Sequence, residues 1–105
     1  MPIEFEVIDR RGYRIVCTKE TWRRKTRKRP WMNSEEVIDI IKRTIEEPTM
    51  PLFKDADYDD RQVYYRRTNM RGKYMKVVVA FDDKGNGEII TATPTNNGKP
   101  GEKLL

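Results

Sequence analysis

The segment Lys73–Phe81 constrains the fold of this chain more than any other part of the sequence. It contains the uninterrupted apolar run Val77-Val78-Val79-Ala80-Phe81. The run is far too short to cross a membrane, and it lacks the alternation of a strand with one wet face. Consecutive β-branched residues of this kind are typical of a central strand that is buried on both faces. The sequence therefore predicts a sheet built around this strand.

Several other segments predict strands that could join it. Ile3–Asp9 alternates apolar and acidic residues, which is the period-2 pattern of a half-buried strand. A turn at Arg11-Gly12 would make it one arm of a hairpin. The remaining candidate strands are Tyr13–Cys17, a short one at Leu52-Phe53, Gln62–Thr68 and Glu88–Thr93.

Two helices are expected between the hairpin and the later strands. Thr18 is a plausible N-cap for the first, which would run through Trp22 and end near Pro30. It has almost no apolar residues other than Trp22, so Trp22, together with Trp31, must hold it.

The second helix has an apolar stripe and clear ends. Asn33 or Ser34 would cap it, and Pro48 would end it. Its stripe consists of Val37, Ile41 and Ile45, widened by Ile38 and Ile40. The expected fold class is α+β, with an N-terminal hairpin and two helices packed on one face of a curved antiparallel meander. We expect one domain over residues 1–105, with 95–105 as an irregular tail.

The composition excludes several kinds of chemistry. The 105 residues include no histidine and a single cysteine, Cys17. A Ser–His–Asp triad, a Cys–His pair, a histidine metal site and an internal disulfide therefore cannot be built from this chain, and we expect no metal and no cofactor. The N-terminus lacks the pattern of a signal peptide, and no segment predicts a membrane span. A cytoplasmic location is expected.

Charge is strongly segregated along the chain. Segment 10–29 holds ten Lys or Arg and one acid, 35–60 holds nine acids and three bases, and 61–76 holds six bases and no acid. The densest positive run consists of Arg23, Arg24, Lys25, Arg27, Lys28 and Arg29. It could be an ordinary solvated helix face, but six neighbouring cations repel one another. Phosphates would offset that repulsion, which favours a nucleic acid as partner.

The alternation of side chains predicts what the sheet presents away from the helices. If Val77 and Val79 face the helices, and Val63 and Tyr65 do so on the preceding strand, six polar side chains lie on the far face. These are Tyr64, Arg66, Tyr74, Lys76, Thr91 and Thr93. Cations, phenols and hydroxyls together suit a phosphodiester. The alternative is an ordinary wet face of an antiparallel sheet, where the same residue types are common.

Several short motifs, in order, resemble a known superfamily. They are Trp22 followed by Arg29-Pro30, then Val63-Tyr64-Tyr65-Arg66, Lys73–Val79 and Ile89–Thr93. This order resembles the phage-associated branch of the barnase–EndoU–colicin–RelE-like nucleases over residues 13–94. The resemblance implies a RelE-like fold, metal-independent RNA cleavage on the open sheet face, and inhibition by an antitoxin or immunity partner.

The resemblance also implies site residues, with two departures. It points to Arg66, Lys76, Thr91 and Thr93 as catalytic, and to the region of Arg29. The His-Pro of the family falls on Arg29-Pro30, and the tyrosine of its last motif falls on Thr93. Both departures remove a proton carrier. Arginine is always protonated near neutral pH, so proton transfer would pass to groups such as Tyr64.

The sequence thus predicts a toxin-like endoribonuclease with two competing interpretations. RNA, free or on the ribosome, would bind the run Arg23–Arg29 and Tyr74, and the far face would cleave it. The first alternative is a nonenzymatic nucleic-acid- or protein-binding module with a degenerate nuclease fold. The second is an accessory domain whose basic helix docks an acidic protein. No membrane partner is expected.

Overall fold

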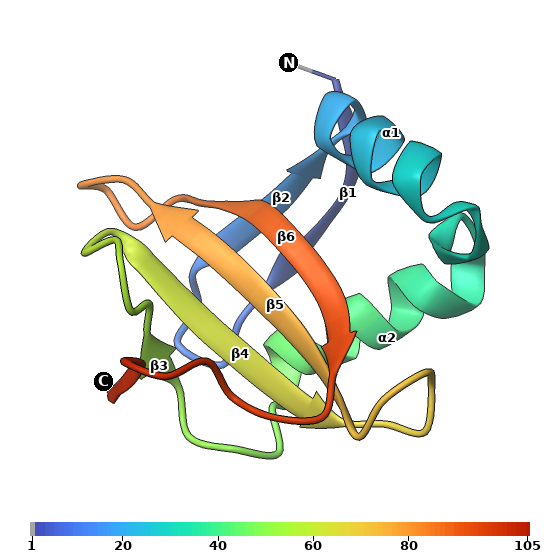
Figure 1. The fold of residues 1–105 in the computed structure, drawn as a ribbon. Coiled ribbons are helices and arrows are strands. Elements are labelled where there is room, and N and C mark those ends of the chain that lie inside the picture. The colour runs from blue at the N-terminus through green and yellow to red at the C-terminus, as the bar shows by residue number, and fades with distance from the viewer. Residues whose placement is uncertain (1) are drawn as a thin grey trace.

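A computed structural model describes residues 2–105 and shows one seven-stranded sheet with two α-helices (Figure 1). The strands lie in the order β1-β2-β6-β5-β4-β3-β7. The elements are β1 (Ile3–Ile8), β2 (Arg14–Thr18), α1 (Lys19–Lys28), the 3₁₀ turn η1 (Pro30–Met32), α2 (Glu35–Glu46), β3 (Phe53–Lys54), β4 (Arg61–Arg67), β5 (Tyr74–Phe81), β6 (Gly87–Thr95) and β7 (Lys103–Leu104). The predicted α+β class is confirmed.

The predicted central strand, β5, pairs with β4 on one side and β6 on the other. Val77 and Val79 are completely buried in the core beneath the helices, and Val78 is buried in a smaller cluster on the opposite face. We call the side covered by α1 and α2 the helix face and the other side the open face. The prediction that β5 is buried on both faces is confirmed.

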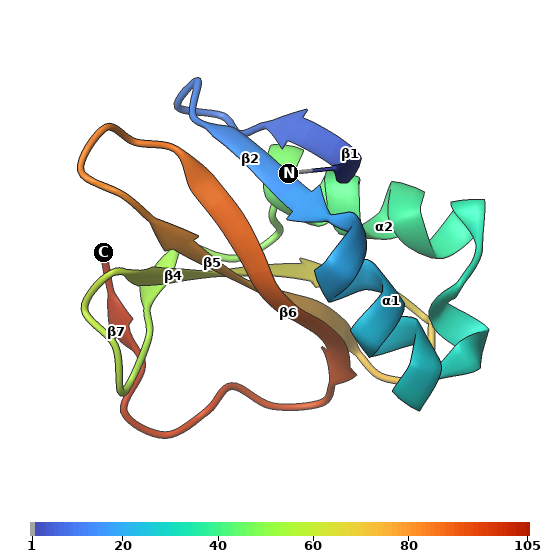
Figure 2. The same cartoon turned by 90° about the horizontal axis from the view of Figure 1, so that it is seen from above.

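Both helices pack on one face of the sheet, as expected (Figure 2). The Ser34 hydroxyl caps α2 by accepting a hydrogen bond from the Val37 backbone N–H. Val37, Ile41 and Ile45 are buried along one side of the helix. This amphipathic stripe forms the middle of the core, since it contacts β1, β4 and β5.

The N-terminal hairpin joins the sheet through a short parallel contact. Ile15 pairs with Gly87 and Val16 with Glu88, both in parallel register, whereas the other strand pairs are antiparallel. Gly87 is required here because a Cβ atom would lie 2.8 Å from Val79 Cγ1. The sheet is therefore mixed rather than a purely antiparallel meander.

The end of the chain is more ordered than the sequence predicted. β6 continues through Pro94 to Thr95, and Lys103–Leu104 forms β7 beside β3. Proline is acceptable in β6 because β2 has already diverged from this end, which leaves it an open edge. Segment 96–102 runs from the end of β6 back to β3 along the open face (Figure 1). The expected irregular tail therefore ends in a strand.

No helix of residues 2–105 has the length and apolar character needed to span a bilayer.

Candidate nucleic-acid interface

Helix α1 is held by its first turn and leaves its remaining turns exposed. Thr18 accepts a hydrogen bond from the Thr21 backbone N–H and so caps the helix. Trp22 is buried, and its ring meets that of Phe5 edge to face at 5.7 Å. The six cations that follow project away from this contact. We call Arg23, Arg24, Lys25, Arg27, Lys28 and Arg29 the basic surface; all are exposed except Lys25, which is half-buried.

Nothing neutralises the basic surface in the part of the chain that the structure describes. Its six cations form no salt bridge with any acid of residues 2–105. Burial lowers the pKa of Lys25, and the neighbouring charges of Arg24, Lys28 and Arg29 lower it further. An anion bound here would relieve the repulsion between these charges.

Arg29 connects the basic surface to the sheet. Its guanidinium donates a hydrogen bond to the Thr93 hydroxyl near the end of β6. Thr93 is the cross-strand partner of Lys76, so its side chain lies on the open face. The last cation of the basic surface therefore reaches around the free edge of β6 to Thr93, one of the residues that the sequence placed in the site.

Arg71 extends this surface, although sequence reasoning did not select it. Arg71 is exposed, and its guanidinium lies 4.4 Å from the centroid of the Trp31 ring, which is partly exposed. Arg71 has a φ of 54°, a left-handed conformation that costs a non-glycine residue about 1 kcal/mol. The acid-free run of bases in residues 61–76 was the available signal, but it does not show which of them lies near α1.

Two of the predicted site residues lie on the wrong face of the sheet. Tyr64 pairs with Val77 and is buried in the core under the helices. Arg66 is on the same face, where its guanidinium donates to the Glu47 carbonyl at the end of α2. Because side chains alternate along a strand, Val63 and Tyr65 occupy the open face instead. Arg66 therefore stabilises the C-terminus of α2 and cannot act beside Lys76.

Tyr64 belongs to a buried polar network. Its hydroxyl donates to Asp9 Oδ2 over 2.8 Å and accepts from Arg11 Nη2 over 3.0 Å. Burial, and then the hydrogen bond to Asp9, raise the pKa of Tyr64 well above its usual range. A group with such a pKa does not serve as a base near neutral pH, so the predicted proton-transfer role of Tyr64 is not supported.

Lys76 is on the open face as predicted, but an acid neutralises it. Its Nζ lies 2.7 Å from Glu102 Oε2, and the other Glu102 oxygen accepts the Tyr65 hydroxyl over 2.6 Å. Burial and then this hydrogen bond raise the pKa of Tyr65. Glu102, in the segment expected to be irregular, is the residue that sequence reasoning missed here. The lysine is therefore closed off from solvent anions.

Thr91 and Thr93 lie together on the open face. Both line a pocket of about 240 Å³ with Lys76. A bulge after Val78 places Ile90 in the same pocket, while Ile89 enters the helix-side core in its place. The rim also carries Asp55 and Asp57, and Lys99 pairs with Asp57. The pocket thus has hydroxyls, and Lys76 and Lys99 already pair with acids. Its third cation, Arg61, lies over the Tyr58 ring and forms no salt bridge within residues 2–105.

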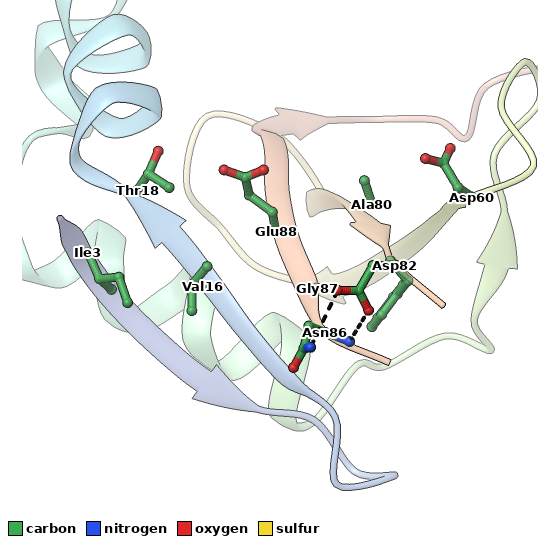
Figure 3. Close-up of a pocket in the computed structure, with 10 residues that line it drawn as sticks. Ile3, Val16, Thr18, Asp60, Ala80, Asp82, Asn86, Gly87 and Glu88 are labelled. Carbon is green, nitrogen blue, oxygen red and sulfur yellow. Dashed lines mark hydrogen bonds between the residues drawn. The ribbon is translucent and has the colours of Figure 1, made fainter. Parts of the chain in front are cut away.

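A further pocket, of about 610 Å³, is acidic (Figure 3). It lies where β2 and β6 diverge, and its apolar floor includes Val16 and Ala80. The carboxylates of Asp60, Asp82 and Glu88 are around it, and Asp82 accepts hydrogen bonds from Asn86. Phosphates would be repelled here, so this pocket is not part of an anion site.

No group of three or more potential metal ligands occurs among residues 2–105. Comparison of the chain with protein-family models, with curated proteins and with solved structures gave no match.

Proposed function

We propose that this chain is an RNA-binding domain and that the basic surface of α1, extended by Arg71, is where the RNA binds. The observation that carries the proposal is the absence of any acidic partner for these cations among residues 2–105. Exposed charges without partners remain available to phosphates. Neutralising phosphates releases their condensed counterions, which is a favourable contribution that does not depend on sequence.

The chemistry of the surface favours RNA over an acidic protein. Four of its six cations are arginines, whose planar guanidinium can hold two oxygens of a phosphate or of a carboxylate at once, so the feature that favours RNA is the aromatic ring beside them. Trp31 beside Arg71 adds a partly exposed aromatic ring of the kind on which unpaired bases stack. The resemblance to RNA-cleaving domains supports the same partner, with the cytoplasm as the expected setting.

Fluorescence anisotropy with a labelled single-stranded RNA tests the proposal. The double variant Arg24→Gln/Arg27→Gln should bind at least about a hundredfold more weakly, since each of the two lost contacts to a charged phosphate contributes about 1.5–3 kcal/mol. Arg14→Gln is the matched control, because Arg14 is an exposed arginine that pairs with Glu6 on the hairpin, away from α1. Equal affinity of the double variant and the wild type would rule out α1 as the binding surface.

RNA cleavage is the second candidate, favoured by the contact between Arg29 and Thr93. That contact places a guanidinium on the Thr93 hydroxyl, and Thr93 lines a pocket together with Thr91. Arg29 could stabilise the charge that develops on a phosphorane. Cleavage would also need a base for the 2′-OH and an acid for the leaving oxygen, and neither Tyr64 nor Tyr65 has a suitable pKa.

Incubation with end-labelled RNA separates binding from cleavage. If the chain is a nuclease, fragments ending in a 2′,3′-cyclic phosphate should accumulate, and Arg29→Ala and Thr93→Val should each slow their formation. An acidic antitoxin that covers the basic surface should then stop the cleavage. If RNA stays intact in the presence of translating ribosomes while it remains bound, the domain binds RNA without cutting it.

A further inference from the structure

A pocket of about 450 Å³ separates the open face of the sheet from segment 96–102. Aromatic and apolar side chains of the sheet side form its floor, including Phe53, Tyr65 and Tyr74. Asn97 and Pro100 contribute from segment 96–102. Its size and its mixture of aromatic walls with a few polar groups are those of a site for a small organic ligand.

The aromatic floor is a fixed arrangement. The Phe53 and Tyr65 rings meet edge to face at 5.8 Å, and Tyr65 and Tyr74 do so at 6.3 Å. Tyr65 is only 2% exposed, whereas Phe53 and Tyr74 are half-buried. The innermost ring therefore orients the two outer ones, and Tyr74 remains accessible for stacking.

The polar groups of the pocket favour an uncharged ligand. Glu102 uses both of its carboxylate oxygens, one with Lys76 and one with Tyr65, so it presents no unpaired charge to a ligand. Asn96 accepts the Lys73 backbone N–H. The side-chain amide of Asn97 is exposed, makes no hydrogen bond within residues 2–105 and is therefore available to a ligand in the pocket. An amide can both donate and accept, which matches the edge of a nucleobase.

The pocket adjoins the basic surface. Tyr74 pairs with Thr95 at the end of β6, and Thr93, two residues earlier on that strand, receives the hydrogen bond from Arg29. Two residues of a strand span about 7 Å. A strand of RNA with a phosphate at Arg29 would therefore have a neighbouring base within reach of Tyr74.

We propose that this pocket takes one nucleobase of a single-stranded RNA, stacked on Tyr74 and hydrogen-bonded by Asn97. The inference rests on the proposed function, since the basic surface holds the backbone of the same strand. It adds that the domain prefers unpaired nucleotides, because a base in a duplex cannot enter the pocket.

Two ligands of equal length and charge test this proposal: a labelled single-stranded RNA and the same ribose-phosphate chain without bases. Wild-type protein should bind the RNA about tenfold more tightly than the abasic chain, in keeping with the contribution of one stacked base. Tyr74→Leu should weaken binding of the RNA about tenfold and leave binding of the abasic chain unchanged. Tyr74→Phe keeps the ring and should keep the difference.

The two proposals can fail separately. Wild-type affinity of Tyr74→Leu for RNA would overturn the base pocket, while the Arg24→Gln/Arg27→Gln result would still decide the role of α1. Titration of the wild type with the four uncharged nucleosides, followed by NMR, covers the case in which Tyr74→Leu does not fold. Backbone amide shifts at Asn97 and Gly98 with at least one nucleoside are expected at millimolar concentration; unchanged spectra with all four would refute the pocket.

Discussion

The ammonium of Lys76 lies 2.7 Å from a carboxylate oxygen of Glu102, and the two side chains are only 13% and 5% exposed. The pair joins the middle of the sheet to a segment 26 residues later in the chain. It holds segment 96–102 against the open face, and with it the roof of the aromatic pocket. Removing either partner would leave the other charge buried without compensation.

Glu102→Gln is therefore expected to lower the free energy of unfolding by about 3 kcal/mol, within the range for a broken buried ion pair. Urea denaturation followed by circular dichroism measures this change. Asp59→Asn is the matched control, because Asp59 is 98% exposed where it meets Lys54 and its loss should cost less than about 1 kcal/mol. Equal effects of the two variants would mean that the Glu102 pair contributes no more than a surface pair.

Asp9 should make stability depend on acid pH. Burial raises the pKa of this carboxyl, but hydrogen bonds from the Tyr13 backbone, Tyr64 and Arg11 outweigh it and hold the pKa below the ordinary 3.8. The Asp9 carboxylate is therefore protonated at a lower pH in the folded protein than in the unfolded chain. The stabilisation is complete above about pH 4 and is lost as the pH drops through the folded pKa.

Urea denaturation at a series of pH values between 7 and 2 checks this prediction. Asp9→Asn should be less stable at pH 7 by about 1–3 kcal/mol and should lose less stability on acidification than the wild type. Glu6→Gln removes an exposed carboxylate that pairs with Arg14 and should cost less than about 1 kcal/mol at pH 7. Parallel pH profiles for wild type and Asp9→Asn would contradict the assignment.

Trp22 should determine whether α1 stays attached. It is the one large apolar residue of this helix and is 6% exposed, so Trp22→Ala is expected to cost about 3–5 kcal/mol and part of the helical circular dichroism. Trp31→Ala removes the same side chain from a half-buried position and should cost less. A larger effect at Trp31 would show that η1, rather than α1, anchors this part of the chain.

The salt dependence of RNA binding should report the number of cations that contact phosphates. For single strands the logarithm of the binding constant falls with the logarithm of salt concentration, with a slope of about −0.7 per neutralised phosphate. Arg27→Gln should therefore flatten the slope by about 0.7, and Arg14→Gln should leave it unchanged. Identical slopes for the wild type and Arg27→Gln would show that Arg27 contacts no phosphate.

The sequence was sufficient for the elements whose signals are local. Ser34 with the stripe of Val37, Ile41 and Ile45 specifies α2 within one segment, and the continuous apolar run specifies β5. The basic surface was also predictable, because α1 has a single buried tryptophan and the remaining turns must face solvent. In each case the residues that determine the structure lie within the segment itself.

Which side chains of β4 face the helices was not predictable in this way. Val63, Tyr64 and Tyr65 are all buried, so the strand has no polar–apolar alternation to indicate its faces. The orientation of this strand depends on Asp9 and Arg11, which form hydrogen bonds with the Tyr64 hydroxyl on the helix face. These partners lie more than fifty residues away in sequence. Glu102, which pairs with Lys76 on the open face, is also distant from its partner, by 26 residues.

The parallel contact between β2 and β6 has a consequence for the order of events during folding. Ile15 and Val16 find their partners only in Gly87 and Glu88, and β3 finds β7 at Lys103 and Leu104. While the chain is being synthesised, the N-terminal hairpin has no place in the sheet until Gly87 and Glu88 have emerged. Contacts between such distant segments form slowly. The edge of β2 that pairs with β6 therefore stays open until that segment has been made, while β1 and the two helices can already pack on the rest of the hairpin.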